Sequence, residues 1–339
     1  MVSLSLSSID ASYGALGAER VELNHKALAD AWRRDLAARA AAGHLAGRSV
    51  AAYVKNAERW LNWINSQGIA RPTPADVLAY VAALRNAGLK AASVNAYLDA
   101  IRSLYRWAES QNLYPAIARS ISGLKIRKDE PLACLDRKSI GGLLTHVTGN
   151  NIARLRDRAL IHVLFATGLR LVSLTGANLA DLDIEAGTLA YRGKGDTETS
   201  RRAYLSPSAS TALSEYLTAR RLAWQGRLSP FAPLFAASGN RADGERLSDR
   251  SIRRIVTTLM ERAGHVRRDE TGKITRPRVL SAHSIRRSAI TAAYEARGLD
   301  AAQTLAGHAD PKTTLRAYAR IQKGRILSDL AGALDLETL

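Results

Sequence analysis

Residues 282–320 read AHSIRRSAITAAYEARGLDAAQTLAGHADPKTTLRAYAR and combine two of the chain's seven histidines with several arginines and a late tyrosine. His283 lies three residues before Arg286, and positions i and i+3 share one face of a helix. One end of that helix can therefore present an imidazole and a guanidinium to a single anionic group. His308 follows a glycine and can donate a hydrogen bond to the same anion. Tyr318, ten residues after His308, is a candidate nucleophile.

Two further cations lie upstream in informative places. Arg170 ends the segment ALIHVLFATGLR, and Lys194 lies in the turn YRGKGD. A guanidinium can make paired hydrogen bonds to phosphate and stays charged, whereas a lysine in a glycine turn can reach a minor groove or a leaving oxygen. Taken singly, each has a simpler explanation. Arg170 would follow a helix C-terminus, where cations are favoured, Lys194 would be an exposed turn residue, and Tyr318 would be a packed core residue.

Together these groups form an ordered set: Arg170, Lys194, His283, Arg286, His308 and Tyr318. This order resembles that of the tyrosine recombinases, also called the phage integrase family, and the resemblance covers most of the chain. It implies that the arginines and histidines hold a DNA phosphate, that Lys194 is the general acid, and that Tyr318 attacks to form a 3′-phosphotyrosine. It also implies that no metal or other cofactor is required, because arginines stabilise the developing charge.

Three positions depart from the family pattern. Ser173 stands where an acidic residue is usual, three positions after the first arginine. Arg287 stands where histidine is common, and the spacing from His308 to Tyr318 is ten rather than the usual nine. One extra residue turns a helical face by about 100°, so either the loop before the helix absorbs it or Tyr318 is misplaced. Tyr294 is the other tyrosine nearby, but it precedes His308.

The composition favours a polyanionic partner. Among 339 residues, 49 lysines and arginines face 31 acids, giving a net charge of +18. This excess points to nucleic acid before membrane, although a generally basic proteome would also produce it. Cys134 is the single cysteine, which excludes an intramolecular disulfide and a cysteine-based zinc site. The N-terminus lacks signal-peptide features and no apolar run approaches the ~18–20 residues of a membrane span, so we expect a cytoplasmic protein.

The first half predicts four helices, beginning near residues 19, 49, 74 and 93. Thr73, Pro74 and Asp76 predict an N-cap, first position and first turn for the third of them. Basic side chains lie between the apolar positions and are candidate DNA contacts together with Arg287: Arg59, Arg85, Lys90, Arg102 and Arg106. Four helices with interleaved cations suit a DNA-binding module or a solvated bundle. Their order resembles the family's core-binding, SAM-like domain, which clamps one side of the duplex.

The second half predicts further helices, among them two at 284–297 and 301–305. It also predicts two strands, near residues 188–192 and 201–205, around the loop that carries Lys194. The fold class expected is therefore mainly α with a small β-sheet in an α+β catalytic domain. The expected divisions are a tail (1–16), a core-binding domain (17–126), a linker (127–137), a catalytic domain (138–325) and a C-terminal helix or tail (326–339).

The function that the resemblance implies is site-specific DNA recombination. Its partner would be a double-stranded recombination site, bound by a monomer or dimer that assembles into a homo-tetramer and passes through a Holliday junction. The alternatives are a type IB topoisomerase-like enzyme and a DNA-binding relative that has lost catalysis. The tail places Ile326, Leu327, Leu330 and Leu334 on one face, which we expect to dock on a neighbouring protomer or on its own domain.

Overall fold

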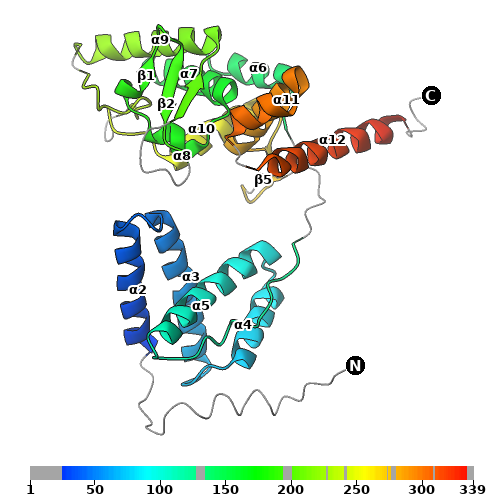
Figure 1. Cartoon of the computed structure of the whole chain (residues 1–339). Helices are drawn as coiled ribbons and strands as arrows, with labels where there is room; N and C mark the ends of the chain where they lie inside the picture. The colour runs from blue at the N-terminus through cyan, green and yellow to red at the C-terminus, as the bar shows by residue number, and fades with distance from the viewer. Residues whose placement is uncertain are drawn as a thin grey trace. The chain divides into compact units, whose positions relative to one another are not determined.

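The computed structural model describes residues 25–126, 134–193, 201–226, 228–239, 243–272, 274–275, 280–307 and 310–333. The chain divides into two compact units, Met1–Lys128 and Asp129–Leu339 (Figure 1). The described residues are mainly helical, and a small antiparallel sheet lies in the second unit. The fold class expected from the sequence is thus confirmed. The segment 1–16 and Lys194, His308 and Leu334 lie outside the described residues.

The described part of the first unit contains four helices, close to the predicted positions: α2 (His25–Ala41), α3 (Gly47–Ser66), α4 (Pro74–Asn86) and α5 (Ala91–Ser110). The start of α4 follows from its sequence. The Thr73 side chain accepts from the Asp76 amide, while the Asp76 carboxylate accepts from the Thr73 amide at 2.7 Å. This capping box satisfies two amides that a helix end leaves without partners, and it confirms the predicted N-cap.

Aromatic residues fill the core of the first unit. Trp32 and Trp60 are buried, and the Trp60 indole Nε1 donates to the Tyr105 hydroxyl at 3.1 Å. Burial raises the pKa of the Tyr105 phenol, because water is excluded from the charged form. A buried indole N–H needs an acceptor, so this bond fixes α3 against α5.

Among its described residues, the second unit adds eight helical segments and five short strands. The helices are α6 (Arg137–Thr145), α7 (Ile152–Thr167), α8 (Leu171–Gly176), the 3₁₀ turn η1 (Leu179–Asp181), α9 (Pro207–Ala223), α10 (Asp249–Arg262), α11 (Ala282–Ala306) and α12 (Pro311–Ala333). The strands are β1 (Leu182–Asp183), β2 (Thr188–Tyr191), β3 (Arg201–Tyr204), β4 (Arg267–Arg268) and β5 (Ile274–Thr275).

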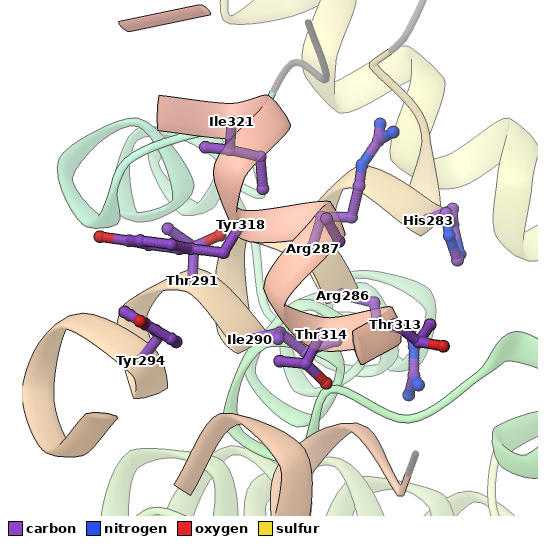
Figure 2. A pocket seen from close by; sticks show the side chains of 11 residues that line it. His283, Arg286, Arg287, Ile290, Thr291, Tyr294, Thr313, Thr314, Tyr318 and Ile321 are labelled. Carbon is purple, nitrogen blue, oxygen red and sulfur yellow. The ribbon is translucent and has the colours of Figure 1, made fainter. Parts of the chain in front are cut away.

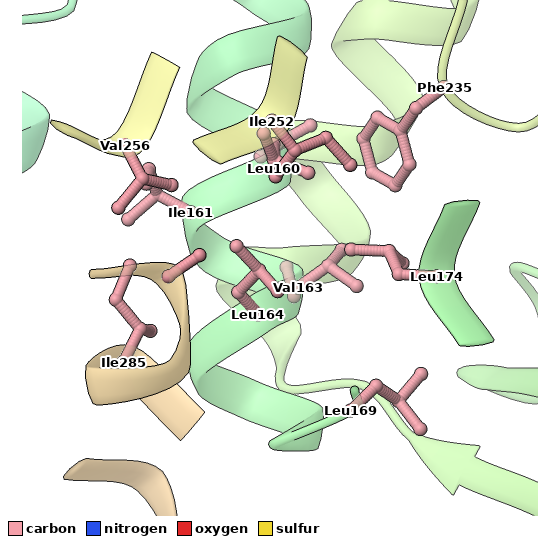
Figure 3. Close-up of a cluster of buried hydrophobic side chains, with 14 of the residues drawn as sticks. Leu160, Ile161, Val163, Leu164, Leu169, Leu174, Phe235, Ile252, Val256 and Ile285 are labelled. Carbon is pink, nitrogen blue, oxygen red and sulfur yellow. The ribbon is translucent and has the colours of Figure 1, made fainter. Parts of the chain in front are cut away.

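Helix α7 forms the centre of the second unit. Its buried residues lie on nearly every side, which is typical of a helix enclosed by neighbours. Leu160 and Leu164 pack among side chains of α10 and α11, including Ile252 and Ile285 (Figure 3). The C-terminal end of this enclosed helix leads through Gly168 to Arg170.

The sheet has the order β1-β2-β3, and all its pairs are antiparallel. Leu189 pairs with Leu182 on one side and Ala203 on the other, and it is fully buried. Tyr191 pairs with Arg201 at the end of the hairpin. This register places both residues at the base of the loop that carries Lys194.

Several elements differ from the sequence expectation. The short elements α8, β1, β4 and β5 were not predicted. In contrast, the two helices expected at 284–297 and 301–305 are present as the two segments of α11, which meet at a kink at Gly298, where φ is 78° and ψ is −164°. The expected boundary between residues 325 and 326 falls within α12. The side chains of the expected tail face lie outside the described part of the chain. No helix of the described residues combines the length and apolarity needed to cross a bilayer.

Candidate active site

The first arginine of the ordered set is positioned by the end of α7. Gly168 ends this helix in the left-handed conformation, with φ at 56°, which glycine adopts without strain. A Cβ at this position would stand only 3.3 Å from Leu305 Cγ, so glycine also permits α11 to approach. Leu169 is buried, and Arg170 follows as the half-buried N-cap residue of α8. Arg170 therefore lies two residues beyond the C-cap of α7 and is also the residue that precedes α8.

Arg286 is the most buried cation of the set, with 4% of its surface exposed. Its Nη1 donates to the Gly168 carbonyl and its Nη2 donates to the Ala306 carbonyl at 2.7 Å. Burial and the nearby charge of Arg170 lower the pKa of Arg286 to about 10, so the group remains charged at neutral pH. One guanidinium thus joins the end of α7 to the end of α11 and keeps a positive charge between them.

His283 lies one helical turn before Arg286. Desolvation by its neighbours, followed by the charges of Arg287, Arg286 and Arg170, lowers the pKa of His283, although the side chain keeps an exposed edge. The three arginines therefore lie close enough to His283 for their charges to act on its protonation. A cluster of like charges that repel one another is stabilised when an anion binds among them.

A pocket of about 250 Å³ opens beside these cations (Figure 2). Its cationic part is formed by His283, Arg286 and Arg287, and its remaining walls come from both α11 and α12. Arg287 is further fixed by a hydrogen bond from its Nη2 to Ser284 Oγ at 2.8 Å. Tyr318 lines the same pocket from α12, so one cavity contains the proposed nucleophile, the proposed phosphate-binding groups His283 and Arg286, and the candidate DNA contact Arg287.

The orientation of Tyr318 differs from that of a nucleophile aimed at the cations. Its ring stacks on Tyr294 with centroids 3.8 Å apart and planes at 22°. Its hydroxyl accepts a hydrogen bond from Gln322 Nε2 at 2.6 Å. In Figure 2 the two tyrosines and His283 lie on opposite sides of the pocket. Tyr294 is therefore the stacking neighbour of Tyr318.

Lys194 and His308 lie outside the described residues, but the residues beside them are informative. A Cβ added to Gly307 would stand 3.3 Å from Arg201 Nη1 and 3.8 Å from Tyr191 Oη. Tyr191 also acts on the pKa of Arg286, which its charge would raise. The hairpin that leads to Lys194 and the turn that leads to His308 therefore meet beside Arg286.

Ser173 occupies the position where the family pattern has an acid. It is buried, and its Oγ donates to the Arg192 carbonyl at 2.7 Å. Arg192 follows β2 directly and precedes the loop that carries Lys194. A neutral hydroxyl thus connects α8 to the start of this loop.

The candidate DNA contacts of the first unit fall into two groups. Arg59 donates to the Tyr97 hydroxyl and lies over its ring, at 5.4 Å from the centroid. Arg102 is half-buried and bonds to Asp99 and to the Ile121 carbonyl. The other three candidates are exposed: Arg85, Lys90 and Arg106. Arg102 and Arg106 also line a hollow of about 370 Å³ with Arg39 of α2.

Helix α10 carries a basic face that the sequence analysis did not single out. Arg250, Arg253, Arg254 and Arg268 line a shallow depression of about 340 Å³ together with serine and threonine hydroxyls. The sequence DRSIRRIVTTLMER contains a detectable signal, since its apolar positions recur at helical spacing and leave the arginines on the opposite face. Tyr191 and Arg201 lie beside Gly307 in the structure, but no sequence pattern indicates this. Their positions depend on how the sheet packs against α11.

Comparison with known proteins matches both units to domains of one protein family. Residues 134–325, more than half of the chain, match the model of the phage integrase family. Residues 30–112 match the N-terminal SAM-like domain of phage integrases. The family expected from the ordered cations and tyrosine is thereby confirmed.

Individual relatives cover both units. The chain is 32% identical over 284 residues to the tyrosine recombinase XerD of Bifidobacterium longum, covering 80% of this chain and 86% of the relative. It is 31% identical to XerC of Yersinia pestis, covering 71% and 72% of the two chains. Among solved structures, the XerH site-specific recombinase bound to a palindromic difH substrate gives a TM-score of 0.62 at 20% identity, covering 83% of this chain and 79% of the other. A lambda integrase dimer bound to a core site gives 0.60 at 16%, covering 85% and 96%. The chain therefore belongs to the phage integrase family, the tyrosine recombinases.

Proposed function

We propose that this protein is a site-specific DNA recombinase that breaks and rejoins DNA through a covalent 3′-phosphotyrosine. The observation that carries the proposal is the single pocket shared by Arg286, His283 and Tyr318, with Arg170 within electrostatic reach. Similarity to recombinases over both units supports it.

The chemistry begins with the scissile phosphodiester. Arg170 and Arg286 bind its nonbridging oxygens and stabilise the charge that accumulates on them during attack. His283 and His308 add hydrogen bonds to the same oxygens. Because the pKa of His283 is lowered without DNA, an arriving phosphate raises it and favours the imidazolium.

Bond exchange then proceeds in balanced steps. The Tyr318 phenol gives its proton to solvent water and attacks phosphorus, a P–O bond to Tyr318 forms, and the bond to the 5′ oxygen breaks. Lys194 donates a proton to the leaving 5′ oxygen. The phosphotyrosine preserves the free energy of the diester, so a 5′ hydroxyl from the partner duplex can reverse the reaction without a nucleotide.

DNA is held by both units. The exposed cations of the first unit contact the duplex, and the basic face of α10 adds phosphate or base contacts from the catalytic unit. The net charge of +18 favours fast, salt-dependent association. This activity places the protein in the cytoplasm with the DNA.

Assembly completes the proposal. Four protomers bring two duplexes together, exchange one pair of strands, and resolve the resulting Holliday junction by exchanging the other pair. The apolar tail face, including Ile326 and Leu330, docks on a neighbouring protomer. Truncation after Arg325 should impair synapsis more than binding to a single site, and equal loss of both would contradict the docking.

The decisive experiment uses Tyr318→Phe. Duplexes that the protein selects from a random library are rebuilt as nicked suicide substrates, and covalent adduct is measured on denaturing gels. Wild-type protein and the control Tyr204→Phe, at a tyrosine that is 75% exposed, should form adduct. Tyr318→Phe should bind equally well and form none. Adduct from Tyr318→Phe would remove this residue from its role.

The same assays separate the alternative functions. Specific binding without adduct from the wild-type protein would indicate an inactive relative. Efficient relaxation of plasmids that lack the selected site would indicate a topoisomerase-like enzyme.

A further inference from the structure

The nucleophile proposed above is held by two side chains that the reaction itself does not use. Tyr294 stacks on the Tyr318 ring at 3.8 Å, and Gln322 donates to its hydroxyl at 2.6 Å. Figure 2 shows the paired rings away from His283 and Arg286. The stack with Tyr294 therefore holds the ring of Tyr318, and the hydrogen bond from Gln322 holds its hydroxyl oxygen.

Helix periodicity explains why α12 presents Tyr318 to Tyr294. Thr314, Tyr318 and Ile321 lie at positions i, i+4 and i+7 and therefore share one face. Thr314 is 1% exposed and Ile321 is 3% exposed, so this face is packed against the rest of the unit on either side of the tyrosine. The stacked position is consequently fixed by helix packing and is not a free rotamer of an exposed side chain.

We propose that Tyr294 and Gln322 are positioning residues that hold Tyr318 in a resting orientation until DNA is bound. This inference rests on the proposed function, because it requires Tyr318 to be the nucleophile. Attack on phosphorus requires the phenol oxygen to come within about 3–3.5 Å of the reacting atom and in line with the leaving oxygen. The phosphate binds at Arg286 and His283, so the oxygen bonded to Gln322 must change its direction first.

The backbone between the two rings supplies two joints for this change. Gly298 interrupts α11 at φ 78°, and Gly307 ends it at φ 55°. His283 and Arg286 lie before both joints and Tyr318 lies after both. Helix α12 can therefore reorient without unwinding the helical segment that holds the phosphate-binding groups.

The size of the effect follows from the two contacts. An aromatic pair and a hydrogen bond each shift an equilibrium by roughly two- to tenfold. Loss of either contact therefore makes the release of Tyr318 easier, while the other contact still favours the resting orientation.

The test measures single-turnover adduct formation at saturating nicked suicide duplex. Tyr294→Leu should form adduct roughly three- to tenfold faster than the wild-type protein, with unchanged DNA affinity. Tyr294→Phe keeps the stacked ring and should match the wild type. A rate for Tyr294→Leu that equals or falls below the wild-type rate, with an unchanged melting temperature, would overturn the inference.

Gln322→Leu provides a second variant at a site that is only partly buried. It should also accelerate adduct formation, and it decides the question if Tyr294→Leu does not fold. An unaccelerated Gln322→Leu in that case would overturn the inference. Failure of the wild-type protein to form adduct contradicts the proposed function instead, so the two failures are distinguishable.

A spectroscopic measurement distinguishes the release of Tyr318 on DNA binding from a purely structural role of Tyr294. The ¹⁹F resonance of 3-fluorotyrosine incorporated at position 318 reports the ring current of Tyr294. Selected duplex should move this resonance toward the position that it takes in Tyr294→Leu without DNA. A resonance that stays unmoved by DNA in protein that cleaves normally would contradict the resting orientation.

Discussion

Replacement of Arg286 by methionine tests whether this buried cation serves the reaction more than the fold. The substitution removes two hydrogen bonds to the Gly168 and Ala306 carbonyls. Each bond from a charged donor contributes about 1.5–3 kcal/mol, so their loss costs roughly 3–6 kcal/mol. Removal of the charge offsets part of this cost. A pKa lowered from 12.5 to about 10 disfavours the charged form by roughly 3 kcal/mol.

The expected net loss in the free energy of unfolding is therefore only about 0–3 kcal/mol. Adduct formation, in contrast, should fall by about 10²–10³, the usual effect of deleting one oxyanion donor. Urea unfolding and single-turnover cleavage of a suicide duplex measure the two quantities. Arg297→Met, at an exposed position of the same helix, should leave both near the wild-type values. Cleavage within tenfold of wild type, or collapse of the fold, would refute the reasoning.

Three further changes probe other contacts. Ser173→Ala should cost about 1 kcal/mol in unfolding free energy and slow cleavage, because it frees the Arg192 carbonyl before the Lys194 loop; unchanged cleavage would show that this bond does not position the loop. Since folding lowers the pKa of His283, the unfolded chain binds the proton more tightly, so unfolding free energy should fall as pH drops below the ordinary value of 6.5. Chemical denaturation at several pH values should show a smaller decline in His283→Gln, and equal declines would refute this. Tyr105→Phe leaves the Trp60 indole without its acceptor and should cost about 1–3 kcal/mol, whereas a urea midpoint equal to wild type would contradict the importance of this bond.

The order of the site residues was readable from the sequence because each carries distinctive chemistry. Arg170 and Arg286 do lie close enough to His283 for their charges to act on its protonation. The direction in which Tyr318 points was not readable. It depends on the stack with Tyr294, which requires α12 to fold back against α11, and no local pattern specifies that packing. The ten-residue spacing leaves Tyr318 on the pocket-facing side of α12.

The longer helices were predictable for a similar reason. Caps such as Thr73 and apolar stripes act locally, so their sequence patterns survive in the folded chain. Short elements such as α8 and β1 have too few residues to show a period. Their conformations are imposed by neighbours, as the pairing of Leu182 with Leu189 illustrates. The break within α11 was predictable from the sequence, because Gly298 adopts a positive φ that glycine tolerates.

The hydrophobic clusters of the two units have no residue in common among the described side chains. Each unit therefore has a hydrophobic core of its own. Core substitutions in one unit need no compensating substitutions in the core of the other. A lineage can exchange the half that grips a target while retaining the half that cuts. The boundary near residue 128 is therefore a suitable junction for chimaeric proteins that recognise other DNA target sites.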